Sequence, residues 1–183
     1  MKRTVTVAAL LLALAMLRWF DSRCGLTTRA LVEYCTPPAE YLVPVEGVEP
    51  RALEGTFGAP RPALRQHEGI DIFAPRGTPV MAAAAGRVIR IGQNRLGGNV
   101  VWVAGAGAQL YYYAHLDSYA DSIAVGQAVV PGSVLGFVGT TGNAIHTPPH
   151  LHFGVYPFVN RFRAVDPFPL LRHARYRATP RRA

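Results

Sequence analysis

The sequence is poor in lysine, in cysteine and in charged residues as a whole. Lys2 is the only lysine among 183 residues, and 16% of the chain is charged while half of it is hydrophobic. A chain this apolar can bury a core, which excludes disorder along its whole length. Its length fits one ordinary domain with terminal additions and is too short for two full domains.

Because lysine is so scarce, the net charge of +8 is carried almost entirely by arginine. Such a charge attracts polyanions, but nucleic acid, anionic lipid and anionic wall polymer fit it equally well. A general preference for arginine together with a basic tail explains the same charge without any partner. The sequence contains no recognised nucleic-acid-binding motif, so we expect no nucleic-acid partner.

The amino-terminal residues have the pattern of an export signal. Lys2 and Arg3 precede an apolar run over residues 5–17. We therefore predict that residues 1–20 are a signal peptide or an N-terminal membrane anchor. The protein is then expected in the periplasm or at the outer face of the cytoplasmic membrane. Both options stay open, because no clear cleavage site follows the run and a membrane span needs about 20 residues.

Cysteine occurs only as Cys24 and Cys35, in a stretch of mixed polarity over residues 21–43 that we interpret as a linker. In an exported chain such a pair favours a disulfide closing a short loop, and two free thiols are the alternative. Neither cysteine is close in sequence to the candidate catalytic residues described below.

Long helical patterns are absent from the predicted domain, residues 44–171. Short runs rich in Val, Ile and Tyr alternate there with glycine-containing turns, which is typical of an antiparallel β domain. The expected strands cover residues 80–84, 87–91, 99–103, 110–115, 134–138 and 150–156. The last stretch, residues 172–183, contains five arginines and no apolar cluster, and it is predicted to be a disordered tail.

The histidines form two units with the spacing of a metal site. His67 and Asp71 make an H-x-x-x-D unit on a segment whose glycine and β-branched residues disfavour a helix. His150 and His152 make an H-x-H unit, and on a strand they share one face roughly 6–7 Å apart. A His-Asp pair and one histidine of the second unit supply three ligands, the usual number for catalytic zinc. A nearby imidazole that exchanges protons would complete a metallohydrolase.

The order of these motifs resembles the M23 metallopeptidases, also called LytM or lysostaphin-type peptidases. The resemblance implies an all-β fold in which an antiparallel sheet forms the floor of a narrow groove with zinc at its centre. It also implies zinc ligands His67, Asp71 and His152, a catalytic pair His115 and His150, and a peptidoglycan peptide as substrate. The matching segments are residues 67–72, 77–80, 98–101, 113–116, 136–139, 141–143 and 150–153.

One segment departs from the family pattern. Between Asn143 and Pro149 the family more often has Ser, Thr or Gly, whereas this chain has His146 and a double proline. These residues would change the shape of the groove wall. Tyr113, Asn143 and His146 are therefore candidates for lining the groove, and an ordinary exposed loop histidine is the alternative for His146.

Two functions compete for this chain. The first is a zinc metalloendopeptidase that hydrolyses peptide cross-links of peptidoglycan through zinc-bound water activated by histidine. The alternative is a catalytically silent or gated relative that binds the cell wall or activates a partner amidase. All three ligands and both catalytic histidines of the family pattern are present, which favours the enzyme. A D-Ala-D-Ala carboxypeptidase would be expected to carry a later E-x-x-H unit, which the sequence lacks.

Overall fold

The computed structural model describes residues 35–38, 40–158 and 163–178. The predicted export segment and Cys24 lie outside these residues, and Cys35 is exposed. Contacts divide the chain into residues 1–36 and residues 37–183, and the fold belongs to the second unit. Among the described residues, no helix combines the length and the hydropathy that a membrane span requires.

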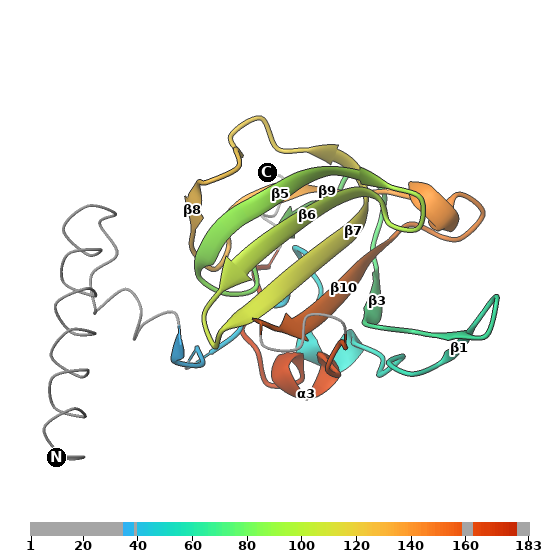
Figure 1. Cartoon of the computed structure of the whole chain (residues 1–183), viewed down its shortest axis with the longest axis horizontal. Coiled ribbons are helices and arrows are strands. Elements are labelled where there is room, and N and C mark those ends of the chain that lie inside the picture. Colours follow the sequence, from blue (N-terminus) through green and yellow to red (C-terminus); the bar gives the residue numbers. More distant parts are fainter. Residues whose placement is uncertain (1–34, 39, 159–162, 179–183) are drawn as a thin grey trace, which may run out of the picture. The chain divides into compact units, whose positions relative to one another are not determined.

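The second unit is built mainly of antiparallel strands (Figure 1). Among the described residues, the 3-10 turn η1 (Pro50–Ala52) precedes the strands, the 3-10 turn η2 (Gly142–Ala144) lies between the last two, and the short helix α3 (Phe168–Leu171) follows them. The strands are β1 (Pro60–Arg61), β2 (Arg65–Gln66), β3 (Ile70–Phe73), β4 (Pro79–Met81), β5 (Gly86–Asn94), β6 (Gly98–Gly105), β7 (Gln109–Tyr119), β8 (Ala128–Val129), β9 (Val134–Val138) and β10 (His150–Pro157).

The main sheet contains eight strands, six of which lie side by side in the order β3-β10-β7-β6-β5-β8. Strand β9 pairs with β7 and with β4, while β1 and β2 form a separate hairpin just before His67. All of these pairs are antiparallel. Each of the six strands expected from the sequence overlaps an observed strand, and the all-β prediction is confirmed.

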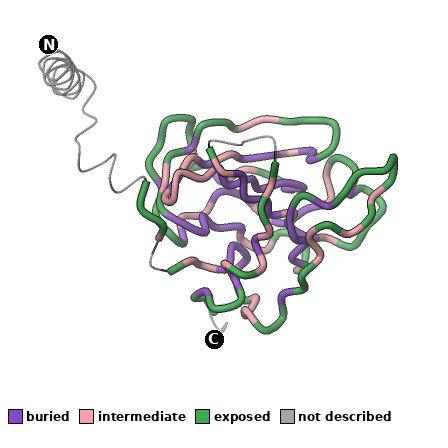
Figure 2. Tube along the Cα trace, turned by 60° about the horizontal axis from the view of Figure 1, so that its bottom comes forward, coloured by how far each residue is buried: buried purple, intermediate pink, exposed green. Residues whose placement is uncertain are grey.

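Because side chains of a strand alternate between its two faces, the larger apolar core lies against one face of this sheet and a smaller apolar cluster that includes Tyr112 and Tyr156 lies on the other. Figure 2 shows the buried stretches along the strands inside the unit and the exposed stretches mostly in the connections. Tyr113 of β7 and Phe153 of β10 are both fully buried, with ring centroids 5.3 Å apart. The opposite face of β10 carries His150 and His152, so alternation separates the core from the candidate site.

Backbone hydrogen bonds join residues on the outer sides of both predicted domain boundaries to the fold. Val43, assigned to the linker, is fully buried, and its N–H donates to the carbonyl of Arg175 at 2.8 Å. The Arg175 N–H in turn donates to the carbonyl of Tyr41, and the Gly47 N–H donates to that of Arg177. The basic stretch thus joins the fold through its backbone, which its exposed arginine side chains do not indicate in the sequence.

Candidate metal centre

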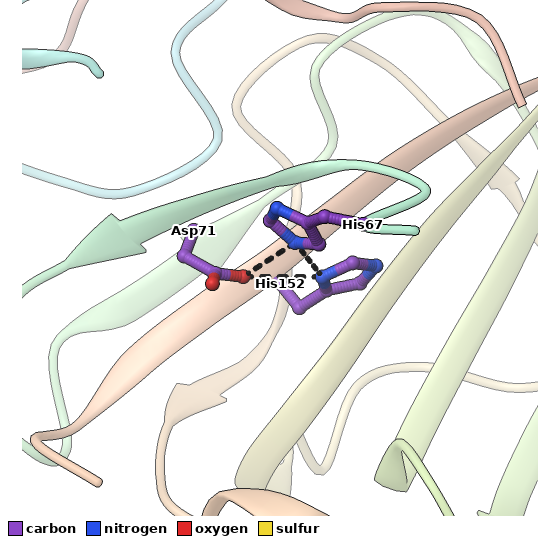
Figure 3. Close-up of side chains that lie close together, drawn as sticks. All are labelled: His67, Asp71 and His152. Carbon is purple, nitrogen blue, oxygen red and sulfur yellow. Dashed lines mark hydrogen bonds and ion pairs between the residues drawn. The ribbon is translucent and has the colours of Figure 1, made fainter. Parts of the chain in front are cut away.

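Three donor atoms from two distant segments converge on one point. His67 Nε2 lies 2.9 Å from His152 Nδ1 and 3.0 Å from Asp71 Oδ1. The third side of this triangle, from His152 Nδ1 to Asp71 Oδ1, measures 3.1 Å (Figure 3). The structure therefore brings together the three residues that the sequence resemblance implied as ligands.

The protonation of these groups shows why a cation fits between them. His67 Nδ1 lies 2.8 Å from the carbonyl oxygen of Thr56, which can only accept, so this nitrogen carries the proton of the neutral ring. The lone pair of His67 Nε2 then faces a carboxylate oxygen. His67 Nε2 and the Asp71 carboxylate are thus two buried acceptors in contact, and a cation among the three atoms would relieve their repulsion. Tetrahedral zinc with bonds of about 2.0–2.1 Å holds its donors about 3.3 Å apart, close to the observed spacing.

The backbone brings the two segments together by strand pairing. Asp71 of β3 lies directly opposite His152 of β10 in the antiparallel register. Gly69 allows the close approach of the His67 segment, because a Cβ atom at this position would lie 2.8 Å from Cε1 of His152. Any larger residue at position 69 would push His67 away from the other two donors.

A second layer of contacts holds the Asp71 carboxylate in place. Arg61 of β1 forms an ion pair with Oδ2 of Asp71, which leaves Oδ1 directed at the two imidazoles. The Asp71 backbone N–H donates to the Thr56 hydroxyl at 3.2 Å. Burial acts to raise the pKa of the Asp71 carboxyl, but the adjacent imidazoles of His152 and His67 hold it well below its usual range. Asp71 is therefore anionic at neutral pH.

His150 and His115 stand beside the three ligands without joining them. His150 Nε2 lies 3.8 Å from Asp71 Oδ1, and its Nδ1 lies 2.8 Å from the carbonyl oxygen of Pro148. His115 Nδ1 lies at the same distance from the carbonyl oxygen of Thr141. The two rings pack edge to face with centroids 4.9 Å apart. Because both Nδ1 atoms donate to backbone carbonyls, the Nε2 atom of each ring is the nitrogen left to exchange a proton with the site.

The backbone of His115 adopts a conformation that is unusual for a residue with a side chain. Its φ of 61° lies in the left-handed region, at an irregular point in the pairing of β7 with β6 and β9. The Thr141 segment supports it and packs so tightly on β6 that a Cβ at Gly142 would overlap the Gly97–Gly98 backbone. Burial lowers the pKa of the His115 imidazole to about 4, so the ring is neutral at pH 7.

The three candidate groove residues have different outcomes. Tyr113 does not line the site: it is fully buried on the core face, where its hydroxyl accepts the N–H of Ala83. Its neighbour Tyr112 faces the site instead, with its ring centroid 5.9 Å from that of His152. Successive residues of a strand point to opposite faces, so only one of these two neighbouring tyrosines can face the site. Asn143 of η2 and His146 of the segment that leads from η2 to β10 are exposed, and their groove-lining role stays a prediction.

Three residues near the site were missed in the sequence. Arg61 and Thr56 support Asp71 and His67, and Phe73 lies beside His150 with ring centroids 5.3 Å apart. Arg61 and Thr56 precede the H-x-x-x-D unit by six and eleven residues, counted from His67, and no local pattern connects them to it. Only Phe73 was detectable, because it follows Asp71 by two residues and shares its face of the strand.

Comparison with known proteins identifies the family. A model described as peptidase family M23 matches residues 65–167, more than half of the chain. The L-Ala–D-Glu endopeptidase of Bacillus subtilis is 42% identical over 114 residues, 59% of this chain. The peptidoglycan DD-endopeptidase ShyC of Vibrio cholerae is 31% identical over 116 residues, 63% of this chain. The chain spans only about a third and a quarter of these two proteins, 35% and 25%.

A solved structure shows the same fold. The catalytic domain of lysostaphin, an antimicrobial peptidase from Staphylococcus simulans, is 32% identical and superposes with a TM-score of 0.58. The match covers 67% of this chain and 94% of that domain. The matched residues include both donor segments and both flanking histidines. The chain belongs to peptidase family M23.

Proposed function

We propose that this chain is a zinc-dependent endopeptidase that hydrolyses peptide cross-links in peptidoglycan. The observation that carries this proposal is the triangle of three metal-binding atoms, with sides of 2.9–3.1 Å, beside two further imidazoles. The substrate class comes from the relatives, one of which is a peptidoglycan DD-endopeptidase and another an L-Ala–D-Glu endopeptidase.

The ligand set suits zinc in a catalytic role. His67 Nε2, Asp71 Oδ1 and His152 Nδ1 would hold the ion with three protein donors, as in catalytic zinc sites generally. Zinc in this position would supply a Lewis acid that activates water and polarises the carbonyl of the scissile bond. Arg61 keeps the second oxygen of Asp71 engaged, so the carboxylate presents one oxygen to the site.

His150 and His115 would perform the proton transfers. Each ring is fixed through its Nδ1 by a backbone carbonyl, so its Nε2 has a defined direction. One of them takes a proton from the attacking water and returns a proton to the leaving amine, and both can stabilise the developing oxyanion. A positioned acid or base of this kind contributes about 10²–10⁴-fold to the rate.

The site of action follows from the substrate and from the amino-terminal sequence. Peptidoglycan lies outside the cytoplasm, and residues 1–20 have the pattern of an export signal or membrane anchor. We therefore place the activity in the periplasm or at the outer face of the cytoplasmic membrane. Among peptidoglycan bonds we favour the direct cross-links between stem peptides.

Digestion of purified, cross-linked peptidoglycan by the full chain tests the function directly. We expect cross-linked dimers to disappear with zinc present, to persist with a chelator, and the cleaved bond to be identified by mass spectrometry. A matched His150→Ala variant should keep its zinc but cut about 10²–10⁴-fold more slowly. Intact dimers in the presence of zinc-loaded protein would overturn the endopeptidase proposal and favour the silent or gated relative.

A further inference from the structure

Strand β3 forms an open edge of the main sheet next to the metal centre. It pairs with β10 on one side and, in the part of the chain that the structure describes, with no strand on the other (Figure 1). In an antiparallel pair, alternate residues direct both backbone groups toward the partner strand. The Asp71 N–H donates to the Thr56 hydroxyl and so points away from β10. Asp71 and Phe73 therefore direct their backbone groups toward the open edge.

Three of these four backbone groups remain available. Only the Asp71 N–H has a partner, whereas no hydrogen bond within the described residues uses the Asp71 carbonyl or the N–H and carbonyl of Phe73. Buried or half-buried backbone groups normally find a partner, which is why an unpaired edge readily accepts another extended chain. The open edge thus offers two acceptors and one donor in the spacing of a strand.

Beside this edge lies a cavity of about 440 Å³, a volume typical of ligand sites. One wall consists of Asp71, Ile72 and Phe73, and the other consists of residues from the segment that contains η1, Gly47–Glu54. This segment precedes the part of the chain that matches the family model, residues 65–167. The cavity is therefore built partly from sequence that the family match does not include.

The cavity and the candidate metal centre share one residue, Asp71. Asp71 lines the cavity, and its carboxylate is one of the three groups that could hold a metal. The Phe73 ring is 52% exposed and packs against His150, which places it between the open edge and the proposed proton-transfer group. A chain paired along Asp71–Phe73 would therefore lead directly to the metal ligands.

We propose that the open edge of β3 binds one arm of the substrate peptide as an added strand. The proposal rests on the endopeptidase function and assigns a binding subsite to it. A peptide arm matches the site because every residue of it carries a donor and an acceptor, so backbone pairing holds it whatever its side chains are. The substrate carbonyl would accept from the Phe73 N–H, and substrate N–H groups would donate to the carbonyls of Asp71 and Phe73.

A pair of variants at position 73 separates the backbone donor from the ring. Phe73→Pro removes both the N–H and the ring, whereas Phe73→Ala removes the ring alone. Proline is tolerated on the open side of an edge strand, and zinc content and melting temperature confirm that each variant is folded. The probes are synthetic peptides that contain the bond identified in the digest. The full peptide extends on both sides of that bond, and each truncated peptide lacks the outer residues on one side.

We expect kcat/KM of Phe73→Pro to fall about 3- to 10-fold below that of Phe73→Ala on the full peptide, the worth of one net hydrogen bond. The difference should vanish on the peptide that lacks the bound arm. Equal kcat/KM for the two variants on the full peptide would overturn the subsite. Because the unaltered protein must cleave both peptides first, this outcome is distinct from failure of the endopeptidase function.

A substrate change tests the same contacts if the proline variant does not fold. Replacing single amides of the peptide by esters, away from the scissile bond, removes one N–H donor at a time. We expect a 3- to 10-fold loss of kcat/KM at one or two positions on the same arm. Uniform kcat/KM across all ester positions would overturn the proposal without any change to the protein.

Discussion

The two faces of strand β10 differ in almost every property. On one face Leu151, Phe153 and Val155 are fully buried in the core. On the other face His150 is buried and His152 is partly exposed, and both point to the candidate metal centre. The residues alternate one by one along the same eight-residue strand. A single strand therefore supplies both the packing that stabilises the fold and the groups that carry the chemistry.

This comparison teaches that stability and function can be changed separately on this strand. The core face contributes through burial of apolar area, which is worth about 25 cal/mol per Å² and needs no specific partner atoms. The site face contributes donor atoms whose directions are fixed by carbonyls and by Asp71. Substitutions on one face should then alter unfolding, and substitutions on the other face should alter metal binding and activity.

The largest effect is expected from His152→Ala. Loss of one of three ligands should abolish stoichiometric zinc binding and all detectable cleavage. The metal-free protein should keep a similar melting temperature, because His152 lies outside the buried apolar core. Zinc content by elemental analysis and calorimetry of the metal-free variant check both statements. A variant that unfolds without metal would show that the site face also stabilises the strand.

The corresponding substitution on the core face is Phe153→Ala. We expect it to cost about 3–5 kcal/mol of unfolding free energy, because a fully buried ring that packs on Tyr113 is replaced by a cavity. Folded molecules of the variant should still bind zinc, since the imidazoles point the other way. Denaturant titration measures the first effect and zinc titration the second. Normal stability with weakened zinc binding would contradict the separation of the two faces.

The same alternation explains how much of the molecule could be predicted. The strands of the sheet and the pairing of His67 and Asp71 with one histidine of the H-x-H unit follow from local patterns in the sequence, whereas the choice of His152 came from the resemblance to the family. The error at Tyr113 arose within such a pattern, because three successive tyrosines do not show which of them faces the core. Strand register decides that question, and register is a long-range property.

Other features were beyond sequence reasoning because they join distant segments. The pairing of Val43 with Arg175 involves only backbone groups, which every residue carries. The ion pair of Arg61 with Asp71 depends on how the β1–β2 hairpin folds back over the site. Because the chain is rich in arginine, the presence of an arginine at position 61 does not indicate that it pairs with Asp71. Contacts of these kinds require the three-dimensional structure.

Arg61 allows a finer test of the site face, because it supports a ligand without being one. Arg61→Met should weaken zinc binding about 10-fold, as loss of a residue that orients a metal ligand commonly does. Arg61→Lys should restore part of the affinity, since lysine keeps the charge but not the planar guanidinium. Competition with a chromophoric chelator measures both dissociation constants. Equal affinity in all three proteins would show that Asp71 is held by the backbone alone.

The smallest effect is expected at His146, which belongs to neither face. Its side chain is exposed in the segment before β10 and forms no hydrogen bond or ion pair within the described residues. His146→Ala should change stability by no more than about 0.5 kcal/mol and kcat/KM by no more than roughly two-fold. His150 is only four residues away, so this substitution is a matched control for removal of an imidazole near the site. A larger loss of kcat/KM with unchanged zinc content would instead assign His146 to the wall of the substrate groove.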